Sequence, residues 1–523
     1  MILGDLPNHT FNLAAMAARS PLRLQHLVWT FGAYLIVWVA VSISILHLLE
    51  VDYHSTLPFL STEQEAPTPT RVHHSKRSVD QEYEEFYNYT KCFRQVDYGI
   101  LKSISRQVVC DSKGQATTIT RLASNGWSDG SLWEDFALDF TSASAIAPIQ
   151  DPSEEGGDHD PRYRLTPSRV RCHCSLTPTA ASLLDKFFPT NNTVWRCNSP
   201  VPSLPKDMIE TTAILVARKD DHNPFFQLSS ILNGWILVKS LELSLDSTQL
   251  FFLDDGVAME TDTLMQKLLA PRHSIRYGRD IVGQTLGFRR AVFLPFEYSG
   301  PLVEHLDDEQ LCYDSKMIAD FRSDIFRTFG LPLDPHPSFH NTSDPTSECI
   351  ITIISRRPYK GRNLARMWLN EDKIRASMIE AYPMCSFRSI DFATRPMEEQ
   401  IALIASSRVV IGMHGAGMAN VAFASPNTFV IELFPLTTFR FGYRNLCQYL
   451  DLHYIEVRDG VDSEWPVLHK TISDRKWFQT FDLVMKVVLN ADERLRFEER
   501  HTIQRRIHRN HILRLEESAH NPS

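Results

Sequence analysis

The sequence predicts an α/β fold with two Rossmann-like domains that face a cleft. Three observations support this prediction. From residue 211 onward, short apolar runs alternate with helical patterns, which is typical of parallel sheets. A segment rich in Pro, Ser and Asn at 331–346 divides this alternation into two halves. A glycine-rich turn, HGAG at 414–417, follows an apolar run and precedes a short run of small residues.

The first half is expected to form one domain over residues 87–330. Its strands are continuous apolar runs, as expected for parallel strands that are buried on both faces. Its helices carry apolar residues at helical spacing. The predicted strands are 213–217, 249–253 and 290–294, and the predicted helices are 225–243, 263–269 and 311–329.

The second half repeats this pattern and is expected to form a nucleotide-binding domain over residues 331–490. A highly charged run at 491–523 predicts a helical tail. The predicted strands are 349–354, 387–391, 408–412, 428–434 and 452–456, and the predicted helices are 371–381, 397–406 and 418–424.

Residues 27–49 contain no Asp, Glu, Lys or Arg, and the segment matches the ~20 residues needed to cross a bilayer. Arg19 and Arg23 precede it, whereas Glu50 and Asp52 follow it, so its N-terminal side is expected in the cytosol. The alternative is a buried core helix. The prediction is a single-pass type II membrane protein with a cytosolic tail (1–26), a transmembrane signal-anchor (27–49), a stem (50–86) and a lumenal remainder.

Charge and cysteine content narrow the function classes. A net charge of −9 and a pI of about 6.1 argue against a nucleic-acid binder. All nine cysteines follow the apolar segment, on the side that is expected to be oxidising, so disulfides are predicted and at least one thiol has no partner within the chain. Sequons at Asn88, Asn191 and Asn341 are predicted to carry N-glycans.

The glycine-rich turn predicts a nucleotide site. Glycines let backbone N–H groups approach a pyrophosphate at a helix N-terminus, where the helix dipole favours negative charge. We therefore expect Gly415, Ala416 and Gly417 to contact the diphosphate of a nucleotide. The turn lacks the Lys-Ser/Thr pair of a P-loop and is not GxGxxG. The alternative is a tight turn without a ligand.

Three nearby side chains join this predicted site. His414 is expected to donate to a phosphate oxygen or to the sugar attached to it, or else only to cap the turn. Glu432, in the next apolar strand, is expected to accept hydrogen bonds from ribose hydroxyls, since a buried carboxylate without a partner is costly. Asn420 is expected to order the loop.

A basic loop after the first strand of the second half supplies cations. Arg356, Arg357 and Lys360 are predicted to neutralise the diphosphate, and arginine suits bidentate phosphate contacts. For Lys360, an exposed basic loop without a ligand is an equal alternative.

Four blocks in order, at 217–235, 288–302, 354–364 and 398–435, resemble glycosyltransferase family 61. That family includes plant β-1,2-xylosyltransferases of N-glycans and EGF-domain-specific O-GlcNAc transferases. The resemblance covers roughly residues 211–459.

The resemblance implies the type B glycosyltransferase architecture and an inverting transfer from a UDP-sugar to a glycan or glycoprotein in the Golgi or ER. Xylose is favoured as the sugar, because 249–302 and the basic loop are similar to the plant branch. The alternative is N-acetylglucosamine, transferred to an O-linked protein acceptor.

One position departs from the family. Many members carry a His where this chain has Gln227, so the role of that His is not transferred. Asp221 and His222, in the preceding loop, are then the predicted catalytic residues that deprotonate the acceptor. Alternatively, Asp221 caps the helix that starts near Pro224. The same departure motivates a further alternative, a non-catalytic lumenal protein that binds a glycan or a nucleotide.

No obligatory metal is predicted. Asp254-Asp255 follows an apolar run but lacks the spaced Asp-x-Asp arrangement of metal-dependent transferases. We expect a solvated or turn-forming acidic pair, and basic side chains and a helix dipole in the place of a metal.

Overall fold

A computed structural model describes residues 92–110, 117–124, 127–145, 160–165, 169–173, 178–188, 205, 207–310, 312–333, 349–358, 364, 366–464, 467–490, 493 and 496–497. The predicted tail, signal-anchor, stem and N-glycan sites lie outside these residues, as does nearly all of the charged C-terminal run. None of the helices in these ranges is both long and apolar enough to cross a membrane. Residues 77–523 form one compact unit, which is the unit described below.

The first sheet is mixed rather than wholly parallel. Its strands are β1 (Ser105–Cys110), β2 (Thr118–Ser124), β3 (Trp127–Asp139), β7 (Met208–Val216), β8 (Thr248–Phe252) and β9 (Thr285–Phe293), in the order β1-β2-β3-β9-β7-β8, with β6 (Val170–Arg171) beside β3. Only β9, β7 and β8 are mutually parallel. These three are the strands that the sequence predicted, so their parallel pairing is confirmed. From β1 to β9 the pairing is antiparallel, and β1, β2 and β3 were not predicted. The connections from β1 to β2 and from β2 to β3 are too short for a parallel crossover.

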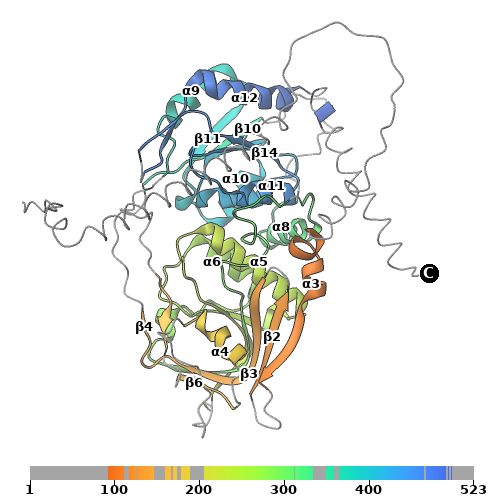
Figure 1. Ribbon diagram of the computed structural model, residues 1–523, viewed down its shortest axis with the longest axis vertical. Helices are drawn as coiled ribbons and strands as arrows, with labels where there is room; N and C mark the ends of the chain where they lie inside the picture. Colours follow the sequence, from red (N-terminus) through yellow and green to blue (C-terminus); the bar gives the residue numbers. More distant parts are fainter. Residues whose placement is uncertain are drawn as a thin grey trace, which may run out of the picture. The chain divides into compact units, whose positions relative to one another are not determined.

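The predicted helices of the first half are confirmed with shifted ends. They are α5 (Pro224–Ser240), α6 (Glu260–Leu269) and α8 (Lys316–Thr328). The last begins later than predicted because Ser315 caps it, accepting a hydrogen bond from Ile318 N at 3.2 Å. Almost every residue of α5 after its first turn is buried, since the helix lies between the first sheet and the second half (Figure 1).

The second sheet is wholly parallel, as predicted. Its strands are β10 (Ile350–Ile354), β11 (Ser386–Ile390), β12 (Val409–Met413), β13 (Phe429–Leu433) and β14 (His453–Val457), in the order β11-β10-β12-β13-β14. Helices α9 (Glu371–Ala381) and α12 (Asp474–Leu489) cover one face (Figure 1). Helices α10 (Met397–Ala405) and α11 (Gly442–Tyr449) and the 3₁₀ helix η5 (Ala416–Phe423) cover the other. The predicted helix at 418–424 is therefore a 3₁₀ helix, and α11 and α12 were not predicted.

Short elements complete the described fold. They are α3 (Gly99–Ser103), β4 (Ser144–Ala145), β5 (Tyr163–Arg164), α4 (Pro178–Asp185), η3 (Leu245–Ser247), α7 (Gly278–Ile281), η4 (Phe392–Thr394), β15 (Val461–Asp462) and β16 (Lys470–Thr471).

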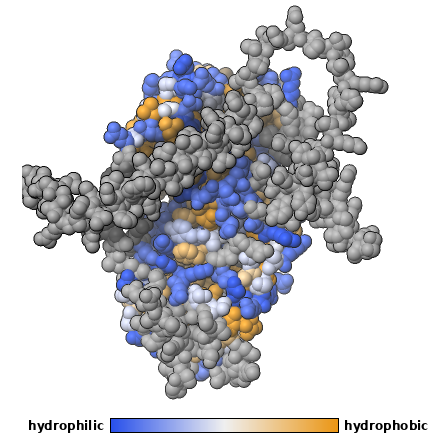
Figure 2. All heavy atoms as spheres, in the orientation of Figure 1, coloured by the Kyte–Doolittle hydropathy of each residue, from blue (hydrophilic) through white to orange (hydrophobic). Residues whose placement is uncertain are grey.

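The two halves share one hydrophobic core. A continuous cluster of buried side chains runs from α5, α6 and α8 to α10, η5 and α11. Within it, the rings of Phe225 and Tyr443 lie 5.1 Å apart, and Gln310 N donates to Asn445 Oδ1 at 3.0 Å. On the face drawn in Figure 2, hydrophilic residues surround smaller apolar areas of the described surface. The contacts across the core hold the loops of both halves in a fixed relation.

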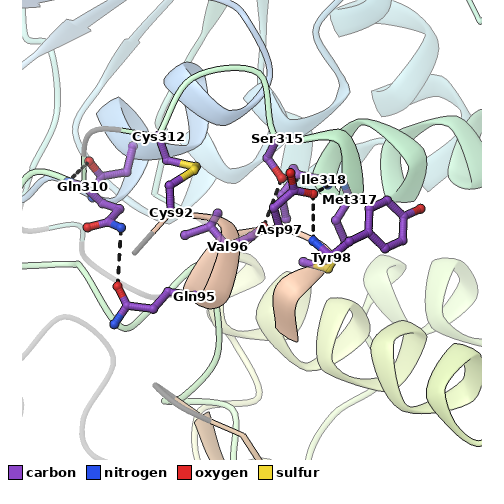
Figure 3. Close-up of a disulfide and its surroundings, with 11 residues drawn as sticks. Cys92, Gln95, Val96, Asp97, Tyr98, Gln310, Cys312, Ser315, Met317 and Ile318 are labelled. Atoms are coloured by element: carbon purple, nitrogen blue, oxygen red, sulfur yellow. Dashed lines mark hydrogen bonds between the residues drawn. A yellow bond between two sulfur atoms is a disulfide. The ribbon is translucent and has the colours of Figure 1, made fainter. Parts of the chain in front are cut away.

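Disulfides fasten the described chain at two places, as the cysteine content predicted. Cys92–Cys312 joins the first described residues to the segment before α8, where Asp97 Oδ1 also accepts from Met317 N at 2.9 Å (Figure 3). Cys349–Cys385 joins the starts of β10 and β11. Cys447 carries a buried free thiol, whereas Cys110 and Cys172 are also disulfide-bonded.

Candidate functional site

The order of the second sheet creates one preferred binding edge. The chain leaves β10 for β11 on one side and returns to β12 on the other side of β10. In open α/β sheets, ligands bind beyond the carboxyl ends of the strands at such a switch point. The loops that follow β10 and β12 begin with Ser355-Arg356 and with His414-Gly415. Two separately predicted motifs therefore meet where the topology favours a ligand.

The glycine turn is built around Arg356. Gly415 has φ +152°, and a Cβ placed there would lie 1.1 Å from Arg356 Nη1. The same Nη1 donates to His414 O at 3.1 Å. Within the described part of the chain, the backbone N–H groups of Gly415, Ala416 and Gly417 donate to no acceptor. A guanidinium beside unsatisfied N–H groups at a helix start is an arrangement that binds anions.

Asn420 stabilises this turn from within η5. Its Nδ2 donates to Gly417 O at 3.1 Å, and its side chain is buried. This bond engages a carbonyl oxygen, so it occupies none of the N–H groups of the turn.

His414 and Glu432 form a buried pair next to the turn. His414 Nδ1 lies 2.6 Å from Glu432 Oε1, with 9% of the His and 1% of the Glu side chain exposed. The other carboxylate oxygen, Oε2, accepts from Tyr454 Oη at 2.8 Å. The His414 ring also stacks on Phe434 at 4.3 Å and meets the edge of Tyr443 at 5.9 Å. Both Glu432 oxygens thus have partners within the protein.

The two tyrosines near Glu432 remain protonated. Burial raises the pKa of Tyr454 well above its ordinary value, and the charge of Glu432 raises it further. Burial also raises the pKa of Tyr443, and the charge of Glu432 raises it further. The charges of Arg356 and Arg366 oppose this rise but do not cancel it. Tyr454 is therefore a permanent donor to the carboxylate.

The neighbouring predicted cation, Arg357, does not bind at the turn. Arg357 is 46% exposed and reaches Asp372 at 3.3 Å and Glu371 at 3.6 Å, at the start of α9. Lys360 lies outside the described residues. Arg356 is thus the member of the predicted basic set that the structure places beside the glycine turn.

On the first half, the loop after β7 carries the predicted base. Asp221 Oδ2 accepts from Val257 N at 2.7 Å, and Oδ1 contacts His222 Nδ1. Asn223 caps α5, its Oδ1 accepting from Phe225 N at 3.1 Å, so the capping alternative for Asp221 is wrong.

Within this loop, solvent reaches His222 but not Asp221. Burial alone would raise the pKa of Asp221, but the contacts with His222 and Val257 and the charge of Arg218 hold it below its ordinary value. A buried, permanently ionised carboxylate is a weak proton acceptor, whereas the His222 side chain is 32% exposed.

Aromatic rings connect this loop to His414. Phe225, in the first turn of α5, contacts Tyr443, which contacts His414. Gln227, at the position of the family His, is buried and donates to Asp220 O at 2.7 Å. Gln227 therefore supports the loop through its side-chain N–H group.

Glu297 is a site residue that the sequence reasoning missed. It follows β9, is 1% exposed, and its Oε1 accepts from Lys219 N at 2.8 Å and Asp220 N at 2.7 Å. Burial raises its pKa to about 8. A lone carboxylate just after an apolar strand, within the block at 288–302, was the available signal. Glu297 fastens the loop after β7 to the loop after β9.

We expect Glu297→Gln to make stability less sensitive to pH. Between its ordinary pKa of 4.5 and about 8, the folded protein holds a proton that the unfolded chain has lost, so stability falls as pH rises. One such proton is worth about 1.4 kcal/mol per pH unit at most. The side-chain oxygen of Gln can still accept from Lys219 N and Asp220 N, as Glu297 Oε1 does.

The measurement is the urea unfolding free energy of both proteins from pH 5 to pH 9. The free energy of unfolding of Glu297→Gln, relative to that of the wild type, should increase as pH rises. Glu304→Gln, at an exposed position, is the control, and its relative free energy of unfolding should not increase with pH. Parallel curves for wild type and Glu297→Gln would show that Glu297 is ionised throughout.

Of the two predictions for Asp254, solvated or turn-forming, the second is confirmed, because its Oδ1 accepts from Gly256 N at 2.9 Å. It is 1% exposed and binds Arg218 through Oδ1 at 2.7 Å from Nη2, while Oδ2 accepts from Arg218 N at 2.9 Å. Both oxygens are thus occupied by Arg218, whereas Asp255 is exposed. Among the described residues, no group of three or more His, Cys, Asp or Glu side chains could hold a metal ion. The metal requirement stays a prediction.

Comparison with known proteins bears on the same region. Residues 265–431 match the family model described as Glycosyltransferase 61. A β-1,2-xylosyltransferase of Arabidopsis thaliana is 22% identical over 281 residues, covering 48% of this chain and 52% of that protein. An EGF domain-specific O-linked N-acetylglucosamine transferase of Drosophila melanogaster is 26% identical over 162 residues, covering 30% and 27%. The β-1,2-xylosyltransferase RCN11 of Oryza sativa subsp. japonica is 23% identical over 251 residues, covering 43% and 45%.

The chain thus spans about half the length, or less, of the curated relatives it matches. The family match runs from α6 to β13 and includes both loops of the switch point, the one with Arg356 and the one with the glycine turn. The matched stretch contains the residues that form the candidate anion site, so the predicted resemblance to glycosyltransferase family 61 is confirmed over residues 265–431.

Proposed function

We propose that this protein transfers a sugar from a UDP-sugar to a glycan or glycoprotein, with inversion at the anomeric carbon. The observation that carries the proposal is the meeting of Arg356 with the unsatisfied N–H groups of Gly415, Ala416 and Gly417 at the switch point. That arrangement suits the diphosphate of a nucleotide-sugar. The match to the Glycosyltransferase 61 model supports a transferase that uses it.

The proposed reaction is a direct displacement. An acceptor hydroxyl attacks the anomeric carbon while the bond from that carbon to the β-phosphate oxygen breaks, and the electron pair stays on the phosphate. Arg356 and the N–H groups stabilise the departing UDP. The hydroxyl proton goes to the loop after β7, where His222 is the exposed base beside Asp221.

This division of labour corresponds to the type B architecture, with two Rossmann-like domains facing a cleft. The second half binds the nucleotide and the first half presents the acceptor. We also propose that residues 27–49 anchor the protein in the Golgi or ER membrane with the catalytic part in the lumen, because that segment is uncharged and long enough to span a bilayer.

Xylose is the sugar that we propose for the donor. Two of the three relatives described above carry the name β-1,2-xylosyltransferase. The relative from Drosophila keeps N-acetylglucosamine as the second candidate. A non-catalytic lumenal binder of a glycan or nucleotide is the alternative from another class, favoured by Gln227 at the position of the family His, where its side-chain nitrogen donates to Asp220 O.

The test is UDP release by the purified full-length chain from a panel of UDP-sugars, with N-glycan acceptors and with or without EDTA. We expect release from UDP-xylose that persists in EDTA and falls by about a hundredfold or more in His414→Ala. Arg357→Ala, outside the turn, is the control and should retain most activity.

Other outcomes would change the proposal. Release only from UDP-N-acetylglucosamine would replace the donor. UDP binding without turnover of any donor would favour the non-catalytic binder. A protein that does not bind UDP would refute the nucleotide site.

A further inference from the structure

Glu432 lies in a setting that does not suit contact with a ligand. Its carboxylate belongs to a strand whose five residues are all buried, and its own exposed fraction is 0%. Oε1 lies 2.6 Å from His414 Nδ1 and Oε2 accepts from Tyr454 at 2.8 Å. Each carboxylate oxygen could accept a second hydrogen bond, but Glu432 has no exposed surface, so a ribose hydroxyl reaches it only by displacing His414 or Tyr454. The displaced donor would then be buried and unsatisfied, which is unfavourable.

We propose that Glu432 is a positioning residue that holds His414 for the departing diphosphate, and that it does not bind the ribose. This inference rests on the proposed function and refines it. It replaces the role that the sequence pattern suggested for Glu432.

The geometry restrains the His414 ring from several sides. Glu432 fixes Nδ1, Phe434 stacks on one face, and Arg356 binds the backbone carbonyl of the same residue. A carboxylate on Nδ1 keeps the proton there, so the exchangeable position is Nε2. No described residue forms a hydrogen bond with Nε2, and 9% of the side chain remains exposed. Nε2 is therefore the atom that His414 can offer to a substrate.

The carboxylate also supports charge on the ring. When Nε2 carries a proton, the ring is positive, and the negative charge of Glu432 stabilises it, as in other carboxylate–histidine pairs. The Nε2–H group then donates a hydrogen bond to the phosphate oxygen that receives the electron pair as the sugar leaves. The proton stays on His414 and no covalent bond to the protein forms.

The first experiment compares the affinities of UDP and 2′-deoxy-UDP for the full-length wild type and Glu432→Gln. If Glu432 positions His414, the affinity ratio of the two nucleotides is the same in both proteins, within about twofold. If Glu432 binds the ribose, the wild type prefers UDP and the variant loses that preference, which would overturn the inference while the proposed function stands. Failure of the wild type to bind UDP would overturn both.

The second experiment measures turnover of the donor. Glu432→Gln should lower kcat by about a hundredfold and change KM by about threefold or less, since the lost interaction acts in the transition state. The double variant with His414→Ala should be no slower than His414→Ala alone, because both changes remove one unit. If instead the losses of kcat in the two single variants multiply in the double variant, the inference is contradicted.

Matched controls separate positioning from stability. Glu456→Gln makes the same chemical change at the register partner of Glu432 on β14, where the side chain is 28% exposed and pairs with Arg458. It should leave kcat unchanged. Tyr454→Phe removes the other hydrogen bond of Glu432 without touching His414. It should lower the unfolding temperature while kcat stays above that of Glu432→Gln; an equal loss of kcat would point to a structural role and overturn the inference.

Discussion

Replacing Gly415 by alanine is expected to abolish UDP binding and sugar transfer. The added Cβ would lie 1.1 Å from Arg356 Nη1, so the guanidinium has to leave the turn. The backbone there has φ +152°, which an alanine adopts only with strain. The substitution therefore removes the cation and distorts the N–H groups that are proposed to hold the diphosphate.

We expect a loss of at least about a hundredfold in affinity for UDP, because a charge-assisted contact and the anion-binding turn are lost together. Isothermal titration calorimetry with UDP measures it. Gly417→Ala is the matched control two residues away, where the Cβ would meet only Ile354 Cγ2, at 3.3 Å. That variant should bind UDP within about fivefold of the wild type, because a small shift relieves the contact.

Two outcomes would refute the argument. Normal binding by Gly415→Ala would show that the turn does not hold the nucleotide. Equal losses in both glycine variants would show that the turn is generally intolerant and that Arg356 has no special part in it. The Arg356→Lys variant keeps the charge but loses the planar guanidinium. Its affinity for UDP should lie between those of the wild type and Gly415→Ala.

The second half was predictable from sequence because its local signals agree with its environment. Strands such as β10, β12 and β13 are buried at every residue, and continuous apolar runs indicate such strands directly. The glycine turn was also predictable, because its residues are consecutive in the sequence. The strand order that places Arg356 beside Gly415 is a property of the sheet, which no local pattern contains.

The first half was harder because its sheet changes character. In β2 only two of seven residues are buried, so the strand has no continuous apolar run, and its pairing depends on distant strands. The ion pair of Asp254 was missed for a related reason. Asp254 looks like one of two acidic residues at a strand end, and only the fold shows that Arg218, from the loop after β7, binds both its oxygens.

That pair leads to the second large effect: Asp254→Asn is expected to destabilise the protein by about 3 to 5 kcal/mol. Arg218 and Asp254 both have side chains with 0% exposure. The Arg218 guanidinium also lies over Phe252 at 4.3 Å and donates to Val257 O at 2.9 Å. Without the carboxylate, the buried positive charge retains Asp262, at 3.6 Å, as its ion-pair partner, together with the charge of Asp221.

Urea unfolding of the full-length protein at neutral pH measures this effect. Asp246→Asn is the matched control, because Asp246 pairs with Arg272 at 2.9 Å but both side chains are more than 70% exposed. The same chemical change there should cost about 1 kcal/mol or less. A similar small cost for Asp254→Asn would show that water reaches Arg218.

The consequence of losing Asp254 extends to the acceptor side of the site. Arg218 begins the loop that ends at His222, and Asp254 holds the first residue of that loop through its backbone N–H. If the loop is positioned in this way, Asp254→Asn lowers kcat even at temperatures where the variant is fully folded, while UDP affinity, set by the second half, stays near that of the wild type. Replacing Arg218 and Asp254 together by Met and Leu should restore much of the stability, because the buried guanidinium is removed together with the carboxylate that binds it, but not the activity. A double variant with full activity would show that packing alone places the loop.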